Sequence, residues 1–235
     1  MNKIIVRAVH LPTDADLGLM TGAAKMTQVR GLMPDGVELN VGLLGRLLKM
    51  GHTSVLEHAD FAVVVENATR VFLAQITRHR LASFTSASQQ YQVHDGFDYL
   101  VPPFSPNDPE EDELHRRYVA MMIQIDSLYQ DIERLLGRDW ARYILPGACR
   151  NTLLMKGNLR EWFTVVFPQR LCKRNTPETL LVMSKALHIA ANGGMVELCK
   201  HTGPACLTIG VCDQGSMCCG KPYRDWTAML PGASI

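Results

Sequence analysis

The sequence predicts an α+β fold: a single mixed α/β domain over residues 1–235 with a central sheet and long helices. Segments 3–11 and 59–68 are rich in β-branched residues, which favour strands. A long run at 108–139 has the apolar spacing that is typical of an amphipathic helix. The chain is 47% hydrophobic and shows no internal repeat or low-complexity linker, so we expect one large domain with a sizeable core.

The first half of the chain is expected to alternate strands with short helices. A short helix is predicted around 18–27, and 40–51 predicts a second helix with an asparagine cap and a glycine stop. Residues 69–80 have helical spacing and run into three adjacent basic or titratable side chains. Segment 91–103 predicts a further strand that ends at two prolines.

The second half is expected to be mainly helical. Asp108 can cap the long helix, and acidic residues crowd its positive N-terminal end. Residues 141–167, with a turn near 156–158, and residues 176–201 predict further helices. The Gly/Cys/Pro-rich tail from about residue 203 is expected to be irregular. Apolar residues of the long helix recur at alternating spacings of four and three, which predicts a buried stripe of Leu114, Tyr118, Met121, Ile125, Leu128, Ile132 and Leu135.

Composition excludes several classes of function. Lys and Arg number 24 against 23 Asp and Glu, so no overall basic field is available for nonspecific nucleic-acid binding. No stretch approaches the roughly 18 apolar residues that a membrane span needs, so no membrane partner is expected. The seven cysteines come without an export signal, which indicates reduced thiols in a cytoplasmic protein. Any anion recognition must therefore come from local clusters.

The first such cluster is the run Arg78-His79-Arg80, which precedes a series of hydroxyl and amide side chains. Three adjacent cationic or titratable groups repel one another unless an anion lies among them. At a helix end the chain bends, so these neighbours can spread around a large anion, with arginine forks and imidazole nitrogens as donors. The alternative is a solvated basic helix end favoured by the macrodipole, and both interpretations stay open from this run alone.

Two further clusters favour anions over metals. Segment 51–61 contains two histidines and Glu57 at a spacing that fits no strong zinc pattern, whereas its small hydroxyl residues follow a glycine and can bind phosphate. Segment 141–163 places several arginines among apolar residues, with Glu161 as the one acid close to them. Because an unpaired buried charge is destabilising, a polyanionic ligand is the economical explanation.

The cysteines of the tail leave two interpretations open. Together with His201 they offer enough ligands for a structural zinc, but their spacings are not those of a standard zinc ribbon. Reduced thiols that pack an irregular tail are the default, and no metal site is predicted. The residues concerned are Cys199, Cys206, Cys212, Cys218 and Cys219.

Five segments, taken in order, resemble the motifs of the flavin-dependent thymidylate synthases. Arg78-His79-Arg80, followed after seven residues by Ser88, resembles the signature of that family. The segments GHTSVLEHADF, ARYILP, NLREWF and QRLCKRNTPE resemble its Gly-His-Thr/Ser…Glu-His, Ala-Arg-x-x-Leu-Pro, Asn-Leu-Arg and later arginine segments. The tail CDQGSMCCGKP is similar to the Cys-rich ending of some members.

The resemblance implies an activity, a set of cofactors and an assembly. The reaction is the reductive methylation of dUMP at C5 to dTMP, with methylenetetrahydrofolate as the carbon donor and FAD, reduced by NADPH, as the hydride source. The implied assembly is a homotetramer of mixed α/β domains with FAD and nucleotide sites at subunit interfaces. The pyrophosphate of FAD would then offset the charge of the Arg-His-Arg run.

The resemblance also implies site residues, position by position. Arg170 would contact the pyrimidine carbonyl and stabilise negative charge as C5 becomes nucleophilic, a placement that needs a one-residue gap after Asn158. No cysteine is expected as a covalent catalyst. The residues implied for FAD are Ser54, Glu57, Arg78, His79, Arg80, Asn158, Arg160 and Arg174. The positions implied for the nucleotide are Gln75, Ser86, Ser88, Gln90, Arg142 and Arg170.

Two of these positions depart from the family pattern. Ser86 stands where a glutamate is expected, and Gln90 stands where an arginine is expected. Loss of one charge-assisted contact weakens binding by about 1.5–3 kcal/mol, which by itself does not abolish an enzyme. The first hypothesis is therefore dUMP methylation. The alternatives are the same flavin chemistry on another pyrimidine nucleotide such as UMP, and a flavin-binding homologue that has lost methylation.

Overall fold

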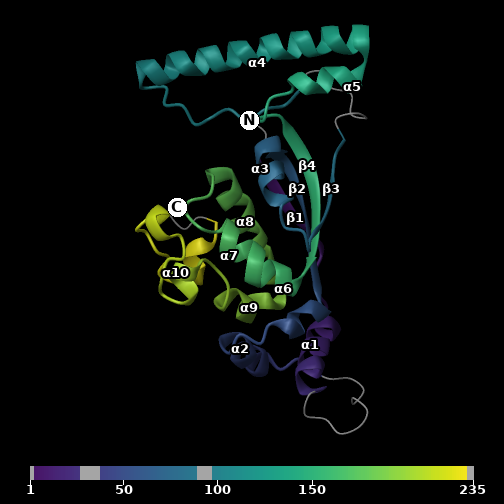
Figure 1. Ribbon diagram of the computed structural model, residues 1–235, viewed down its shortest axis with the longest axis vertical. Helices are drawn as coiled ribbons and strands as arrows, with labels where there is room; N and C mark the ends of the chain where they lie inside the picture. Colours follow the sequence, from purple (N-terminus) through teal and green to yellow (C-terminus); the bar gives the residue numbers. More distant parts are fainter. Residues whose placement is uncertain (1–2, 27–37, 89–96, 232–235) are drawn as a thin grey trace. The chain divides into compact units, whose positions relative to one another are not determined.

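The computed structural model describes residues 3–26, 38–88 and 97–231, and these residues form two compact units (Figure 1). In their described parts, unit 1 contains Glu66–Arg78 and Thr85–Leu153, and unit 2 contains Ile4–Val65, His79–Phe84 and Leu154 onward. The expectation of one domain over the whole chain stays a prediction.

The sheet has four strands in the order β1-β2-β4-β3 and is antiparallel. Its first two strands confirm those predicted at 3–11 and 59–68. The central strand β4 buries every second residue from Asn151 to Gly157, the alternation of a strand with one face against a core. The strands are β1 (Ile5–His10), β2 (Asp60–Thr69), β3 (Ser83–Ser86) and β4 (Arg150–Asn158).

Unit 2 contains most of the short helices, and its helix α8 packs against both β1 and α7 (Figure 1). The fully buried Trp162 anchors this core, because its indole N–H donates to the carbonyl of Phe61 at 2.9 Å and the two rings lie 5.0 Å apart. The hydroxyl of Thr202 donates to the carbonyl of Phe163 at 2.6 Å and ties the tail to the same core. The helices are α1 (Asp14–Met26), α2 (Val41–Lys49), α6 (Leu159–Glu161), α7 (Phe167–Arg170), α8 (Pro177–Ala190), α9 (Val196–Lys200) and α10 (Ala205–Thr208).

Two predicted helices of this unit are confirmed. The helix expected around 18–27 is α1, which begins earlier, at Asp14. The helix expected over 40–51 is α2, where the side chain of Asn40 accepts from the backbone N–H of Leu43 at 2.9 Å. This cap satisfies one of the free N–H groups at the start of the helix.

Unit 1 contains α4, the longest helix of the described chain. The carboxylate of Asp108 caps it as predicted, accepting from the N–H groups of Glu110 and Glu111 at 2.9 and 3.3 Å. Met122 of this helix forms a small core with Phe97 and Cys149. The helices of this unit are α3 (Arg70–Ile76), α4 (Pro109–Leu136) and α5 (Arg138–Ala141).

The buried stripe predicted along α4 is wrong: the helix buries Met122 and Tyr129, whereas Tyr118, Ile125 and Ile132 are only half-buried and the other four predicted residues are exposed. Leu114, Met121, Leu128 and Leu135 are 49, 54, 51 and 72% exposed, although their helical spacing is as predicted. Periodicity shows which residues share a face, but it does not show what covers that face. Despite its 28 residues, α4 is not apolar enough to cross a membrane, and neither is any other helix of the described chain.

The helix predicted over 141–167 is wrong over β4, which occupies Arg150–Asn158 before helix begins again at Leu159. The Leu, Met and Lys residues of this strand favour helix, but the segment lies between β2 and β3 in the sheet. Pairing on both edges and burial of alternate side chains override that local preference.

The bounds of two other predicted helices differ from expectation. The helix predicted over 69–80 ends at Ile76, so the Arg-His-Arg run lies beyond the helix end. The helix predicted over 176–201 is interrupted at Gly193-Gly194, where the second glycine has a φ of +88°, and resumes as α9.

The strand predicted in 91–103 is also wrong over its described residues, 97–103, where only Tyr99 forms a bridge, to Cys149. The short strand β3 was not predicted. It has only four residues, and three of them are exposed, so no hydrophobic pattern marks it in the sequence.

Candidate functional site

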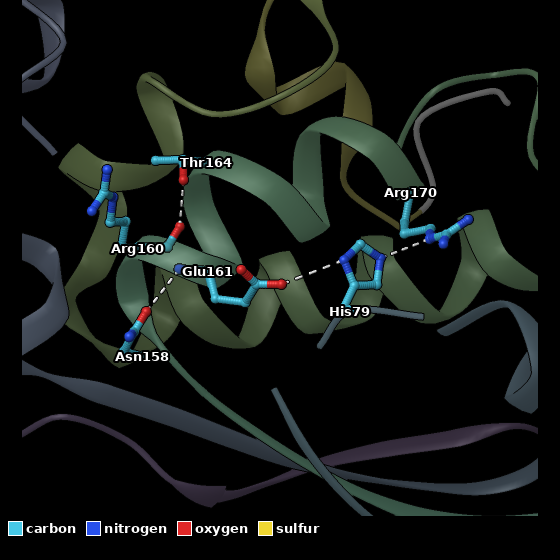
Figure 2. A network of polar contacts seen from close by, with 6 residues as sticks. All are labelled: His79, Asn158, Arg160, Glu161, Thr164 and Arg170. Carbon is cyan, nitrogen blue, oxygen red and sulfur yellow. Dashed lines mark hydrogen bonds and ion pairs between the residues drawn. The ribbon is translucent and has the colours of Figure 1, made fainter. Parts of the chain in front are cut away.

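His79 is the centre of a buried polar network in unit 2 (Figure 2). The Nε–H of Arg170 donates to its Nε2 at 2.9 Å, and its Nδ1 lies 3.5 Å from Oε1 of Glu161. The histidine is 4% exposed and the glutamate 3%. The three side chains therefore connect a buried carboxyl group, through an imidazole, to a guanidinium (Figure 2).

The network fixes the tautomer of His79. An arginine Nε–H can only donate, so Nε2 of the ring accepts and the proton of the neutral ring lies on Nδ1, facing Glu161. Burial, and next the charge of Arg170, lower the pKa of His79 from 6.5 to about 4. At pH 7 the ring is therefore neutral, and its contact orients the guanidinium of Arg170 without neutralising it.

Glu161 is positioned by the start of α6. Asn158 is the cap of this helix, and its side-chain oxygen accepts from the backbone N–H of Glu161 at 2.8 Å (Figure 2). Burial raises the pKa of the Glu161 carboxyl group above its usual value. At pH 7 the contact with His79 is thus a long polar contact from a neutral ring rather than an ion pair.

Arg170 is positioned by a helical segment that contains one π-helical turn. After α6 the chain forms this turn over Trp162–Val166 and then continues as α7, which ends at Arg170. A π-turn holds one residue more than an α-turn. This π-turn lies between Asn158 and Arg170, where the family resemblance needs a one-residue gap in the match. The extra residue of a π-turn can take up a gap of that length without ending the helix.

Arg170 also lines a pocket of about 670 Å³ in unit 2. This volume is typical of pockets that bind small molecules. Arg174, which the resemblance assigns to the flavin, lines the same pocket. Its polar and charged lining comes from two segments of the chain and consists of Thr164, Gln169, Arg170, Arg174, Asn175, His201, Thr208, Asp213 and Gln214.

A second arginine contact lies at the surface of unit 2. The guanidinium of Arg160 donates to the carboxylate of Glu57, and these side chains are 46 and 49% exposed. Ser54, Arg80 and Arg174 are exposed as well. Accessible guanidinium and hydroxyl donors are the groups that bind phosphate oxygens, so this donor set fits the pyrophosphate of FAD.

The other residues implied for the ligands lie in unit 1. Arg142 is 3.6 Å from the carboxylate of Asp139, and its guanidinium lies 6.0 Å from the centre of the Tyr143 ring. Gln90 lies outside the described residues. The roles of these residues stay predictions. The accessible or half-buried positions concerned are Gln75, Arg78, Ser86 and Ser88.

Sequence reasoning missed Glu161 as a partner of the Arg-His-Arg run. Its signal was that it is the one acid in an arginine-rich apolar segment, but the contact with His79 spans 82 positions and needs the fold. Asp213 and Gln214 were also missed, because they reach the pocket from the irregular tail. Over the part of the chain that the structure describes, no three or more His, Cys, Asp or Glu side chains are placed to hold a metal ion.

Comparisons with known proteins agree on one family. The chain matches the thymidylate synthase complementing protein family, Thy1, over residues 2–192. It is 34% identical over 200 residues to the flavin-dependent thymidylate synthase of Pyrococcus furiosus, covering 81% of this chain and 82% of that protein. The enzyme of that name from Thermococcus kodakarensis is 33% identical over 250 aligned residues, covering 98% of this chain and 99% of its own. That of Nitratidesulfovibrio vulgaris is 31% identical over 192 residues, covering 77% of this chain and 76% of its own.

The family match spans the two arginine contacts of the site but ends before the tail residues that line the pocket. It includes the buried network of His79, Glu161 and Arg170, and it includes the surface contact between Arg160 and Glu57. It covers most of the chain and agrees with the mixed α+β architecture. The chain belongs to the thymidylate synthase complementing protein family, Thy1.

Proposed function

We propose that this protein is a flavin-dependent thymidylate synthase. It methylates dUMP at C5 to give dTMP, with methylenetetrahydrofolate as the carbon donor and NADPH as the reductant. Membership of the Thy1 family and the names of its relatives support this activity. The single observation that carries it is an arginine, Arg170, which lines a ligand-sized pocket and is held there by a buried neutral histidine.

In this proposal Arg170 supplies positive charge where the pyrimidine becomes electron-rich. Its bond to His79 is made by Nε and fixes the direction of the guanidinium, whose planar donors would face a ring carbonyl when the nucleotide is bound. A cation that is already oriented stabilises the charge that develops as C5 becomes nucleophilic. His79 and Glu161 act through Arg170, as positioning residues.

FAD, once reduced by NADPH, supplies the hydride in this chemistry. We assign its phosphates to the accessible donors of unit 2, Arg80, Arg160, Arg174 and Ser54, in agreement with the family resemblance. Three other residues implied for the flavin already have structural contacts within the chain, and the first of them, Glu57, accepts from Arg160. Asn158 caps α6, and His79 holds Arg170, so both also fix the segments that carry the donors.

The proposal includes a homotetramer with sites shared between chains. Its support is the exposed flank of α4, where Leu114, Met121, Leu128 and Leu135 recur every seven residues. Apolar side chains at this spacing are typical of helices that pack against a partner helix. Free cysteines at all seven positions fit the reducing cytoplasm that we expect for this enzyme.

One departure from the family pattern favours a second candidate substrate. Ser86, where the resemblance expects a glutamate, lies at the end of β3 and is exposed. A hydroxyl group is uncharged and can donate a hydrogen bond as well as accept one, whereas a carboxylate is negatively charged and only accepts. The nucleotide that this position recognises can therefore differ from dUMP. The alternative is therefore the same flavin chemistry on another pyrimidine nucleotide, such as UMP.

The test follows the hydrogen at C5. Purified protein is incubated with FAD, NADPH, methylenetetrahydrofolate and dUMP deuterated at C5, and release of the label is measured together with dTMP formation. We expect both, at equal rates. Parallel reactions with C5-labelled UMP and other pyrimidine nucleotides measure the substrate preference.

Each outcome selects one function. Label release from UMP but not from dUMP selects the alternative substrate. A yellow protein that oxidises NADPH but releases label from no pyrimidine nucleotide contradicts the proposed methylation. Omission of methylenetetrahydrofolate is the matched control, because dTMP formation must stop while the flavin is still reduced.

A further inference from the structure

A second, smaller pocket in unit 2 is lined by thiols. Its volume is about 140 Å³, and five of the seven cysteines line it: Cys172, Cys206, Cys212, Cys218 and Cys219. None of the cysteines forms a disulfide. The proposed methylation uses none of these thiols. A cavity lined by this many thiols can either react with an electrophile or bind a metal ion, because the thiolate is both a nucleophile and a metal ligand.

The arrangement of the thiols favours sulfur chemistry over metal binding. Structural zinc needs four ligands in tetrahedral geometry, and at least three must come from the protein in any zinc site. In the described part of the chain, which includes all five thiols, no such group of three is placed to hold a metal ion. Two of the thiols, in contrast, are hydrogen-bonded to each other.

These two are Cys212 and Cys218, which a tight loop brings together. The N–H of Met217 donates to the carbonyl of Gln214 at 3.0 Å, and that of Cys218 donates to the carbonyl of Gly215 at 3.1 Å. Gly215 has a φ of +53°, a conformation that favours glycine and lets the chain reverse here. The loop therefore returns the second cysteine to the first.

The polar contacts make the two thiols unequal. The N–H of Gly220 donates to the sulfur of Cys218 at 3.4 Å, and the thiol of Cys212 donates to it as well; both lower the pKa of Cys218. The N–H of Gln214 lowers the pKa of Cys212, but its bond to Cys218, partial desolvation and the neighbouring thiols together raise it. Cys218 is exposed, whereas Cys212 is half-buried. Cys218 is thus the accessible nucleophile of the pair.

We propose that Cys218 and Cys212 form a reactive dithiol that exchanges with low-molecular-weight disulfides such as glutathione disulfide. The Cys218 thiolate attacks one sulfur of the disulfide, breaks its S–S bond and releases the first glutathione as a thiolate. Cys212 then loses its proton to solvent and attacks the Cys218 sulfur, which forms the Cys212–Cys218 bond and releases the second glutathione. The two cysteines lose two electrons, and one glutathione disulfide becomes two glutathione thiols.

The loop between the two cysteines also forms a wall of the larger pocket. Asp213 and Gln214 line both cavities, as do Arg174 and Cys172. The thiol site therefore lies directly behind the pocket that Arg170 lines. A glutathione adduct on Cys218 or a bond to Cys212 would constrain the loop that carries these shared residues.

Peptide mapping tests the proposal without reference to enzyme activity. The reduced full-length protein is incubated with glutathione disulfide at neutral pH, alkylated and digested with trypsin. One peptide, residues 201–224, contains Cys206, Cys212, Cys218 and Cys219, because Lys221 is followed by proline. We expect this peptide to lose two hydrogen atoms, with the new bond between Cys212 and Cys218.

Variants separate the attacking thiol from its partner. Cys212→Ser is expected to stop at one glutathione on Cys218, which reacts on the order of tenfold faster than Cys219. Cys218→Ser, which lacks the attacking thiol, is expected to form no disulfide bond at Cys212. Cys206→Ser, which removes another thiol of the same pocket, is the matched control and should react as the wild type does.

Three results would overturn the proposal. The first is a bond or an adduct that forms on Cys206 or Cys219 in preference to Cys218. The second is equal reaction of all accessible thiols, which would mean that the pair has no special reactivity. The third is stoichiometric zinc binding by the reduced protein that is lost in Cys218→Ser, measured by native mass spectrometry.

Discussion

Two arginines of unit 2, both assigned to ligands by the family resemblance, are held in opposite ways. Arg170 is bound by a buried imidazole that is neutral at pH 7. Arg160 is bound by the carboxylate of Glu57, and both partners are about half exposed. The first contact fixes position and leaves the positive charge of the guanidinium intact, whereas the second offsets that charge.

These two contacts show which arginine is held in place before a ligand binds. A buried histidine with one tautomer and a buried carboxyl group behind it hold a side chain in one place before any ligand arrives. An exposed ion pair contributes about 0.2–1 kcal/mol and exchanges its partners readily. A ligand phosphate can therefore replace Glu57 at Arg160, while Arg170 is suited to the reacting end of the substrate, where position affects the rate.

The largest effect is expected from Arg170→Lys. An ammonium group keeps the charge but loses the Nε bond to His79 and the planar donor pair, so we expect kcat to fall about 10²–10³-fold. Release of label from C5-deuterated dUMP measures this loss. Arg116→Lys, the same change at a side chain that pairs with Asp112 and Glu113 on α4, should leave kcat unchanged. Equal losses in the two variants would show that arginine chemistry at the pocket is not special.

The next effect separates the shape of Glu161 from its charge. Glu161→Ala leaves the Nδ1–H of His79 without its acceptor, which should lower the free energy of unfolding by about 1–3 kcal/mol and kcat about tenfold. Glu161→Gln keeps an acceptor oxygen and removes a carboxyl group whose pKa burial already raises, so stability should stay within about 1 kcal/mol of wild type. Urea unfolding and steady-state kinetics of both variants test this. A Gln variant as impaired as the Ala variant would mean that the negative charge is required.

The sequence identified the two arginines but not the residues that hold them. The Asn-Leu-Arg segment identified Arg160, and the later arginine segment QRLCKRNTPE identified Arg170, because these motifs are local. The partners of the arginines are not local: His79 and Arg170 are 91 positions apart, and Glu57 and Arg160 are 103 apart. Local patterns also placed β1, β2 and α2, each of which has a cap or a β-branched run of its own.

The fold was mispredicted where tertiary contacts outweigh local preference. β4 consists largely of residues that favour helix, and only its central place in the sheet makes it a strand. The same strand ends at Asn158, the cap that positions Glu161. A turn was expected near residues 156–158, but with helix before it, so the sequence did not show that a central strand leads into this cap.

The third effect concerns the protonation of His79. Its pKa is lowered to about 4 in the folded protein, so between pH 6.5 and 4 the unfolded chain binds the proton more readily, and stability falls as the pH falls. Between pH 7.5 and 5.5 this amounts to about 1 kcal/mol. The raised pKa of Glu161 acts in the opposite sense, since its contribution is lost as the pH rises above 4.5. The nitrogen chemical shifts of the His79 ring, measured by NMR, separate the contribution of the histidine from that of Glu161. We expect a neutral His79 ring protonated on Nδ1 down to pH 5. An imidazolium signal at pH 6 would contradict the network as described.

The smallest effect is expected at the exposed pair, and it decides whether the two arginines differ. Glu57→Gln removes the carboxylate from Arg160, yet both side chains are about half exposed, so the free energy of unfolding should change by at most about 1 kcal/mol. A double-mutant cycle with Arg160→Gln should give a coupling energy of similar size that shrinks in 1 M salt, where the Debye length is about 3 Å. The corresponding cycle between Glu161→Ala and His79→Asn should be larger and insensitive to salt, because those groups are buried. If the exposed pair couples as strongly as the buried one, burial does not distinguish the two arginines, and the assignment of Arg170 to the reacting end of the substrate loses its physical basis.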